Sequence, residues 1–213
     1  MHILGFNIDY NNINLQQNLK YLINKRNIRN KEFIEYFKSI GFNVSLEELQ
    51  KISGGSVISK PHFAKLFLQK GYISDKKTIF SDYFNCKPLC EVEEFIYEPE
   101  EIIKMIKEAN GIAVLAHPQK LKLNDTDLEN KIIELLSYGL EGLECYHSDQ
   151  TLEEMKKLRI IADKYKLLVT KGSDYHGPIV KPLIHLGTGI NNNITNDEEN
   201  VILKKVLNKK TYK

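Results

Sequence analysis

The stretch EPEEIIKMIKEANGIAVLAHP, Glu98 to Pro118, decides the fold that the sequence predicts. Its first half predicts an amphipathic helix that Pro99 opens and Gly111 ends, with three isoleucines on one face. Ile112–Leu115 is a short apolar run, which is typical of a buried strand, and it stops at an Ala-His-Pro sequence. A helix, then a buried strand, then a potential ligand is therefore the pattern to look for in the second half of the chain.

Helix and strand patterns keep alternating after this point. One of the helices is expected to bury a stripe made of Leu152, Met155, Ile161 and Tyr165. Because the strands read as continuous apolar runs, the pattern predicts a parallel sheet with both faces covered, either a barrel or an open doubly wound sheet. The expected elements are helix 127–139, strand 142–149, helix 151–166, strand 167–174, strand 184–189 and helix 195–208.

The first half of the chain has a different pattern. Only HILGFNID, His2 to Asp9, reads as a strand, and residues 12 to 84 have helical spacing. Ser45 and Glu48 predict a capping box, and Pro61 is expected to open a short helix. We therefore expect an α/β domain with a helical insertion, divided into a first strand at 1–11, the insertion at 12–90 and βα units at 91–213.

The composition limits the classes of function. The chain has 213 residues, and its 30 Lys and Arg against 28 Asp and Glu leave a net charge of +2. This balance does not indicate a surface that coats nucleic acid. No apolar run approaches the roughly 20 residues that span a bilayer. Three cysteines, an odd and sparse set, favour a reducing compartment, so we expect a cytoplasmic protein with no membrane partner.

Potential metal ligands follow three of the predicted strands. His117 ends one strand, His147 follows the next, and Asp174 with His176 follow a third. The carboxyl ends of parallel strands meet at one edge of a sheet, and residues two apart in an extended segment point the same way. Imidazole and carboxylate groups are ligands for zinc, manganese or iron. A lone histidine beside a strand is more often structural, but this succession favours a metal site. Gly172 is expected to let the backbone turn sharply before Asp174.

Five short motifs, in this order and spacing, resemble those of the polymerase and histidinol phosphatase (PHP) family. They are HILGF, SKPHFA, GIAVLAHP, LECYHSDQT and KGSDYHGP. They are most similar to the branch of metal-dependent phosphoesterases related to nucleoside 3′,5′-bisphosphate phosphatases, which also trim short RNA. The resemblance covers essentially the whole chain. It implies an α/β fold that forms the C-terminal part of a distorted (β/α)₇ barrel, with two or three metals at its mouth.

The resemblance also implies roles for individual residues. His2, His117, Asp174 and His176 match metal ligands of the family. His176 and His147 are the candidates for a catalytic group that protonates the leaving oxygen. The metals would be divalent ions, with manganese, zinc, iron and magnesium as the alternatives. The expected substrate is a small phosphorylated molecule, a nucleotide or a short RNA end.

Lys60 and His62, in SKPHFA, are the candidates for contacts to the substrate phosphate. They lie in the helical insertion, which could fold over the barrel mouth as a lid. The family usually has Arg where Lys60 stands, and an ammonium is a point charge rather than a bidentate fork. A helix start with a solvated lysine is an equally weighted alternative for this motif.

The chain departs from the family at its start. Members begin with a His-x-His strand and further ligands before the HILG strand, and none of these is present here. A fragment, a misassigned start and a truncated paralogue are the three explanations. The alternative function is therefore an inactive fragment or remnant that binds phosphate ligands or another chain weakly. Without the first strands we expect an open barrel edge through which the chain would oligomerise.

Overall fold

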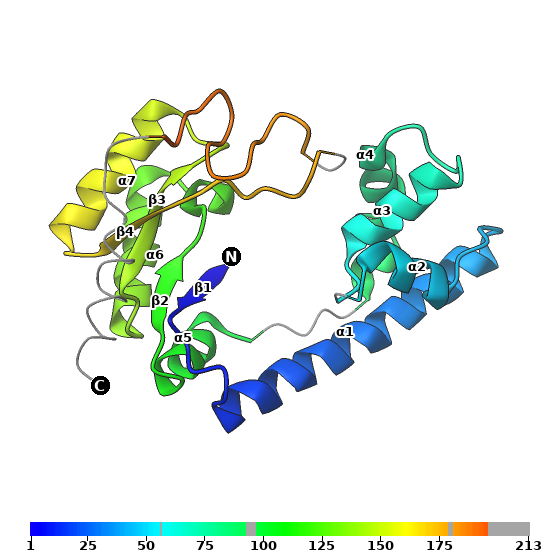
Figure 1. The fold of residues 1–213 in the computed structure, drawn as a ribbon, viewed down its shortest axis with the longest axis horizontal. Helices are drawn as coiled ribbons and strands as arrows, with labels where there is room; N and C mark the ends of the chain where they lie inside the picture. The colour runs from blue at the N-terminus through cyan, green and yellow to red at the C-terminus, as the bar shows by residue number, and fades with distance from the viewer. Residues whose placement is uncertain (56, 93–96, 179–180, 196–213) are drawn as a thin grey trace. The chain divides into compact units, whose positions relative to one another are not determined.

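The computed structural model describes residues 1–55, 57–92, 97–178 and 181–195. The chain forms two compact units, which are described separately: Met1–Leu15 with Tyr97–Lys213, and Gln16–Ile96 (Figure 1). The first unit contains the strands and the second is helical. The helical unit overlaps the range 12–90 of the predicted insertion.

A four-stranded sheet organises the first unit. The strands β2, β3 and β4 are parallel, as predicted, whereas β1 pairs antiparallel with β2. The mixed α/β class is therefore confirmed, although the sheet is not parallel throughout. The strands lie in chain order and are β1 (Ile3–Phe6), β2 (Ile112–Leu115), β3 (Gly142–His147) and β4 (Leu168–Gly172).

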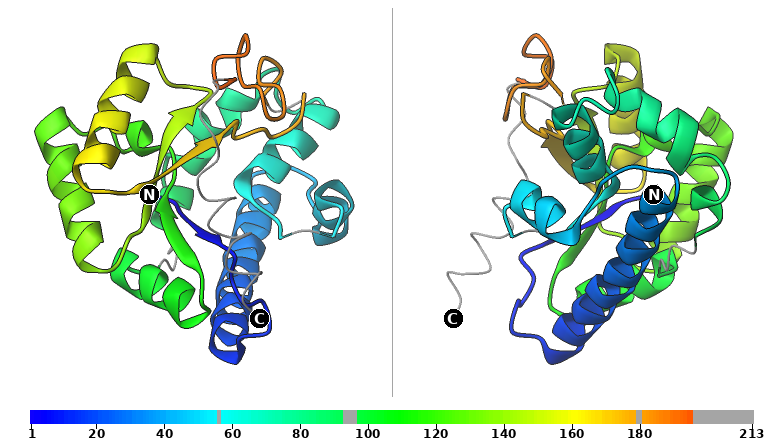
Figure 2. Two further views of the ribbon diagram at one scale, coloured as in Figure 1. Left: turned by 60° about the vertical axis from the view of Figure 1, so that its left-hand side comes forward. Right: turned by 90° about the vertical axis from the view of Figure 1, so that its right-hand side faces the viewer.

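Three helices pack against this sheet. Figures 1 and 2 show α6 and α7 lying side by side along the strands. An aliphatic core fills the interface, in which Leu115, Ile132 and Leu143 are fully buried. Thr151 and Glu154 form a capping box that opens the last of these helices. The helices are α5 (Pro99–Glu108), α6 (Asp125–Ser137) and α7 (Leu152–Lys164).

Two details of the sequence prediction need correction. Met155 of α7 is buried and Ile161 and Tyr165 are partly buried, but Leu152 is 69% exposed and Leu158 takes its place in the stripe. The sheet, not the apolar pattern, selects which side of α7 is buried.

The predicted strand at 184–189 is wrong, because this stretch forms turns with a single bridge between His185 and Gly189. Except for Thr195, the predicted helix at 195–208 lies outside the described residues.

The helical unit has a core of its own, made mainly of phenylalanines. Phe33, Phe37, Phe63, Phe67 and Phe84 are almost completely buried, and the ring centroids of Phe37 and Phe67 are 4.7 Å apart. Edge-to-face and tilted ring contacts of this kind add to the hydrophobic gain. The helices of this unit are α1 (Ile13–Ser39), α2 (Leu46–Ser53), α3 (Lys60–Gln69) and α4 (Lys76–Ile79), followed by helical turns at Phe80–Phe84 and Leu89–Glu91.

The predicted helix starts in this unit are confirmed. Ser45 accepts the backbone N–H of Glu48, whose side chain accepts the N–H of Ser45, and Pro61 lies in the first turn of α3.

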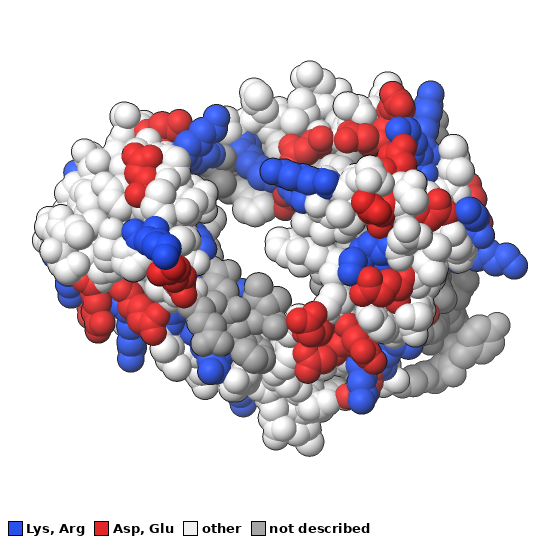
Figure 3. Space-filling model, turned by 180° about the vertical axis from the view of Figure 1, so that it is seen from behind, with Lys and Arg blue, Asp and Glu red and all other residues white. Residues whose placement is uncertain are grey.

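Among the helices of the described ranges, none is both long enough and apolar enough to cross a membrane. On the face drawn in Figure 3, Lys and Arg side chains are interspersed with Asp and Glu. A surface of mixed sign provides no extended basic stripe on that face for a phosphate backbone.

We expect Phe37→Ala to lower the free energy of unfolding by about 3–5 kcal/mol, because it removes a fully buried ring and leaves a cavity. Urea unfolding followed by circular dichroism measures the change. Ile28→Ala, on the same helix and 55% exposed, is the control and should change stability by less than about 0.5 kcal/mol. Similar losses for both variants would show that the phenylalanine cluster is not the core of this unit.

Candidate functional site

His2 and His117 lie next to each other at the edge of the sheet. His2 precedes β1, and His117 follows β2 with a left-handed φ of 31°. The Nδ1 atom of His2 is 3.0 Å from Nε2 of His117, so one of the two rings donates a hydrogen bond to the other. Burial lowers the pKa of both rings, which favours their neutral forms. Two neutral imidazoles thus meet where β1 and β2 pair.

Asp174 and His176 follow β4 and contact each other, with Nδ1 of His176 3.6 Å from Oδ1 of Asp174. They do not lie on the extended segment that was predicted, because Asp174 has a left-handed φ of 50°. The Nδ1–H of His176 donates to the backbone carbonyl of Asp174 at 2.7 Å. Because a carbonyl can only accept, Nδ1 carries the proton and the Nε2 lone pair of the neutral ring is available to a ligand.

His147, at the end of β3, is completely buried and its tautomer follows from its partners. Its Nδ1 atom accepts the backbone N–H of Asp149 at 3.0 Å. The backbone N–H of His147 donates to Gln150 Oε1, Gln150 Nε2 donates to Gln119 Oε1, and Gln119 Nε2 contacts Nδ1 at 3.2 Å. Backbone N–H groups can only donate. Nδ1 is therefore an acceptor towards Asp149 and, by way of the two glutamine amides, also towards Gln119. The proton of the neutral ring is therefore on Nε2.

The Nε2–H group of His147 points at Asp174 without a normal hydrogen bond. Nε2 is buried with no partner among the described atoms, and it lies 3.6 Å from Asp174 Oδ2. Burial and the positive charge of Lys120 lower the pKa of His147 to about 4, so the ring is neutral at physiological pH. A buried donor without a hydrogen-bond partner is costly, so this group calls for a water, an ion or a ligand as its partner.

Two lysines neutralise the carboxylate of Asp174. The ammonium groups of Lys120 and Lys181 donate to its Oδ2 atom at 2.7 and 2.6 Å. Lys120 also lies 3.2 Å from Asp149 Oδ2. Burial opposes ionisation of Asp174, but the hydrogen bonds from both lysines outweigh it and hold the pKa of this carboxyl well below its usual range. Asp174 is thus a fully ionised carboxylate at the centre of the cluster.

A second carboxyl group, Glu144, is buried beneath this cluster in β3. Its Oε2 accepts the backbone N–H of His117 at 2.7 Å, and the side chain is only 6% exposed. Burial raises the pKa of Glu144 to about 7, against the opposing effect of this hydrogen bond. Gly172 is needed for space rather than for a turn, since a Cβ atom there would lie 2.2 Å from Glu144 Oε1.

The structure connects the site residues that were predicted in the α/β domain through a chain of contacts. His2 contacts His117, the His117 and His147 ring centroids are 5.6 Å apart, His147 approaches Asp174, and His176 bonds to Asp174. Their roles in catalysis and metal binding stay predictions.

Four residues of this cluster were missed by the sequence analysis. Asp149 could have been found, because it comes two residues after His147 at a strand end. The other three, Lys120, Glu144 and Lys181, carry no local signal. The partners of Lys120 and Glu144 are 54 and 27 residues away, and Lys181 lies beyond the strand-end motif, seven residues after Asp174.

Lys60 and His62 belong to the helical unit, where both have local contacts. His62 Nδ1 accepts the backbone N–H of Ser59 at 3.0 Å, as in a capping box at the start of α3. The Lys60 ammonium group lies 5.7 Å from the ring centroid of Phe33 and 5.5 Å from that of Phe84. Contact of Lys60 and His62 with a phosphate stays a prediction.

The donor atoms of the cluster fit a divalent cation. Asp174 offers a carboxylate, and His176 offers an Nε2 lone pair while its Nδ1–H is held by a carbonyl, the outer contact that metal-bound histidines usually make. Atoms of His147, Asp149 and Asp174 also lie within 4.8 Å of one another, which is compatible with a cation. In this group His147 would bind the cation through Nε2 only in its other tautomer; in the tautomer that its partners favour, Nε2–H is a hydrogen-bond donor.

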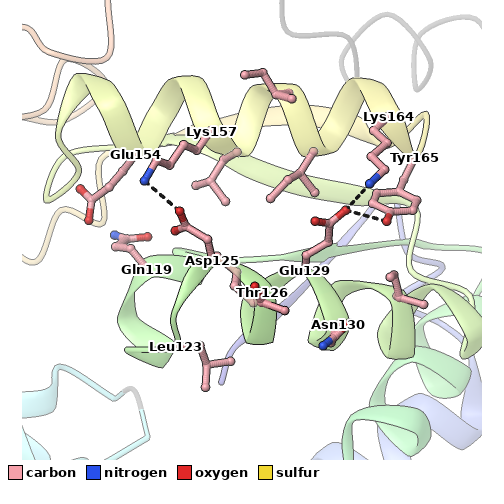
Figure 4. Close-up of a pocket in the computed structure, with 15 residues that line it drawn as sticks. Gln119, Leu123, Asp125, Thr126, Glu129, Asn130, Glu154, Lys157, Lys164 and Tyr165 are labelled. Carbon is pink, nitrogen blue, oxygen red and sulfur yellow. Dashed lines mark hydrogen bonds and ion pairs between the residues drawn. The ribbon is translucent and has the colours of Figure 1, made fainter.

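A hollow of about 560 Å³ lies away from these histidines, between α6 and α7 (Figure 4). Ion pairs cross it from Lys157 to Asp125 and from Lys164 to Glu129. Of the residues that hydrogen-bond to His147, only Gln119 lines the hollow, and no histidine lines it. The clustered histidines and Asp174 lie elsewhere, so we place the candidate site at the edge of the sheet.

We expect Glu144→Gln to raise the free energy of unfolding at pH 8 by at most about 3 kcal/mol and to change it much less at pH 5. The carboxyl pKa is raised from 4.5 to about 7 in the folded chain, so its contribution is fully present below 4.5 and is lost as the pH rises through 7. Glutamine is neutral throughout and keeps an acceptor oxygen.

Urea unfolding at the two pH values, in EDTA, measures this effect. Glu153→Gln, whose side chain is 81% exposed, is the control and should show little change at either pH. An equal effect of Glu144→Gln at both pH values would contradict the raised pKa.

Comparison with models of known protein families gives no match. The 3′,5′-nucleoside bisphosphate phosphatase of Chromobacterium violaceum is 27% identical over 179 residues, which are 84% of this chain and 63% of that protein. The 5′-3′ exoribonuclease Rnm of Escherichia coli is 27% identical over 187 residues, 88% of this chain and 63% of that protein. The chain thus spans less than two thirds of the length of these curated relatives.

Solved structures show the same relationship. A candidate metal-dependent phosphoesterase from Bifidobacterium adolescentis superposes with a TM-score of 0.73 and 27% sequence identity, over 97% of this chain and 70% of that one. The similarity extends across both units and does not depend on one motif. The resemblance seen in the motifs is therefore confirmed: the chain is a relative of the PHP-type metal-dependent phosphoesterases.

Proposed function

We propose that the chain belongs to a metal-dependent phosphoesterase that hydrolyses phosphate monoesters of nucleotides or of short RNA ends. The observation that carries this proposal is the contact cluster of His2, His117, His147, Asp174 and His176 at the edge of one sheet. The relatives named for bisphosphate nucleotides and for RNA support the substrate class.

Within this proposal each residue has a physical task. Asp174, His176 and the His2–His117 pair would hold the divalent ions, whose chemistry is to activate a water and to neutralise phosphoryl charge. The Nε2–H of His147 is positioned to donate a hydrogen bond to a phosphoryl oxygen. The low pKa of His147 keeps this ring neutral, and a neutral imidazole is a hydrogen-bond donor but not a general acid, so protonation of the leaving oxygen would fall to His176 or to water.

The barrel and the lid belong to the same proposal. The four strands would form the C-terminal part of a distorted (β/α)₇ barrel, a fold in which sites lie at the carboxyl ends of the strands. The helical unit would carry Lys60 and His62 to the substrate phosphate. Lys60 would have to leave the rings of Phe33 and Phe84 to do so, at the cost of two cation–π contacts.

A second candidate is a chain that no longer catalyses hydrolysis and binds phosphate ligands only weakly. The observation in its favour is that the Asp174 oxygen Oδ2 already accepts hydrogen bonds from Lys120 and Lys181. In that case the same cluster would bind a cation or a phosphate without turnover.

We expect manganese-dependent phosphate release from adenosine 3′,5′-bisphosphate, and a loss of about 100-fold or more for Asp174→Asn or His147→Gln. Phosphate release is measured for the 213-residue chain and for the longest natural chain that contains it. Asp82→Asn, in the helical unit, and His185→Gln, on an exposed turn, are the matched controls. Absence of turnover in both chains would remove the enzyme proposal in favour of the inactive alternative.

A further inference from the structure

Two ammonium groups compete for one carboxylate oxygen in the candidate site. Lys120 comes from the helical turn Pro118–Leu121 after β2, and Lys181 from the segment that follows β4. Their Nζ atoms lie 2.7 and 2.6 Å from Asp174 Oδ2, and 3.2 and 3.8 Å from Asp149 Oδ2. Lysines from two separate segments thus converge on the same pair of acidic side chains.

This arrangement is electrically balanced and partly shielded from water. The two carboxylates of Asp149 and Asp174 carry as much charge as the two ammonium groups. The side chains of Lys181 and Asp174 are only 25% and 24% exposed, so their interaction is screened less than at an open surface.

The buried Nε2–H of His147 is an independent sign that a ligand belongs at this point. It has no partner among the described atoms and lies 3.6 Å from the same Oδ2 atom. A hydrogen-bond donor and two cations therefore surround one acidic oxygen, and all three could bind an anion once that oxygen is otherwise engaged.

A divalent cation bound to Oδ2 of Asp174 would compete with both ammonium groups for that oxygen. Carboxylate oxygens bind zinc at about 2.0–2.2 Å, closer than either ammonium group lies. Adding two positive charges beside two lysines leaves an excess of positive charge, which a phosphate dianion would balance. The lysines would then have a new partner within reach of the oxygen that they leave.

We propose that Lys120 and Lys181 are exchangeable counter-ions, which neutralise Asp174 and Asp149 until a divalent cation binds there and then bind the phosphate group of the substrate. This inference rests on the proposed metal-dependent function. Exchangeable counter-ions differ from lysines that only bind phosphate in one expected result. Removing one ammonium group must strengthen cation binding while it weakens phosphate binding.

The test measures both affinities on the 213-residue chain. Free Mn²⁺ is followed by electron paramagnetic resonance during titration, and inorganic phosphate binding to the manganese-loaded chain is followed by calorimetry. For Lys120→Met and for Lys181→Met we expect Mn²⁺ to bind about tenfold more tightly and phosphate about tenfold more weakly. Methionine keeps an unbranched apolar stem, so packing is largely retained.

Two further variants separate charge from other effects. Lys120→Arg keeps the positive charge and should bind Mn²⁺ like the unchanged chain. Lys156→Met removes an exposed positive charge from α7 and should alter neither affinity by more than about twofold. Thermal unfolding of each variant, followed by circular dichroism, confirms that the chains compared are folded.

Several outcomes would overturn the inference. They are unchanged Mn²⁺ affinity in both methionine variants, affinities for Mn²⁺ and phosphate that move in the same direction, and absence of Mn²⁺ binding in every chain. Failure of the proposed function gives a different result, because opposite shifts of the two affinities without any hydrolysis would support the counter-ion exchange and remove only the enzyme. Hydrolysis with unchanged Mn²⁺ affinity in the variants would remove only the exchange.

Discussion

The candidate site depends on the parallel pairing of β2, β3 and β4, which brings three carboxyl ends to one edge of the sheet. In this register His147 lies opposite Gly172, so the buried ring and the segment that carries Asp174 begin at the same level. A slip of one residue would turn every side chain of a strand to the other face. The aliphatic core beneath α6 and α7 makes such a slip costly, and thereby holds the site in place.

Burial then gives the ionisable groups at this edge different protonation states. Burial dominates at Glu144 and raises its pKa to about 7, whereas hydrogen bonds from two lysines lower the pKa of Asp174. His147 is buried beside positive charge and stays neutral. Neighbouring groups whose pKa values are driven apart in this way are typical of sites that bind charged ligands or transfer protons.

The backbone contributes strain at two of the same positions. His117 and Asp174 have φ values of 31° and 50°, a conformation that side-chain-bearing residues rarely adopt and that costs of order 1–3 kcal/mol each. Hydrogen bonds compensate for it, since the His117 N–H donates to Glu144 and the Asp174 carbonyl accepts from His176. The surrounding structure holds this strain at a cluster of ligand-type side chains, which agrees with a functional site. The strained backbone also directs these side chains towards one another.

The sequence by itself determined what depends on neighbours in the chain: the βα alternation, the helix starts, and the ligand-type residues at strand ends. Capping boxes and apolar periodicity act over three or four residues and can be read directly. The sheet decided which side of α7 is buried, so the prediction that Leu152 lies in the buried stripe was wrong. The tautomer of His147 and the neutralisation of Asp174 were decided only by the tertiary structure. The partners of Asp174 include Lys120, 54 residues away in the sequence, and a contact between such distant positions exists only once the strands have paired.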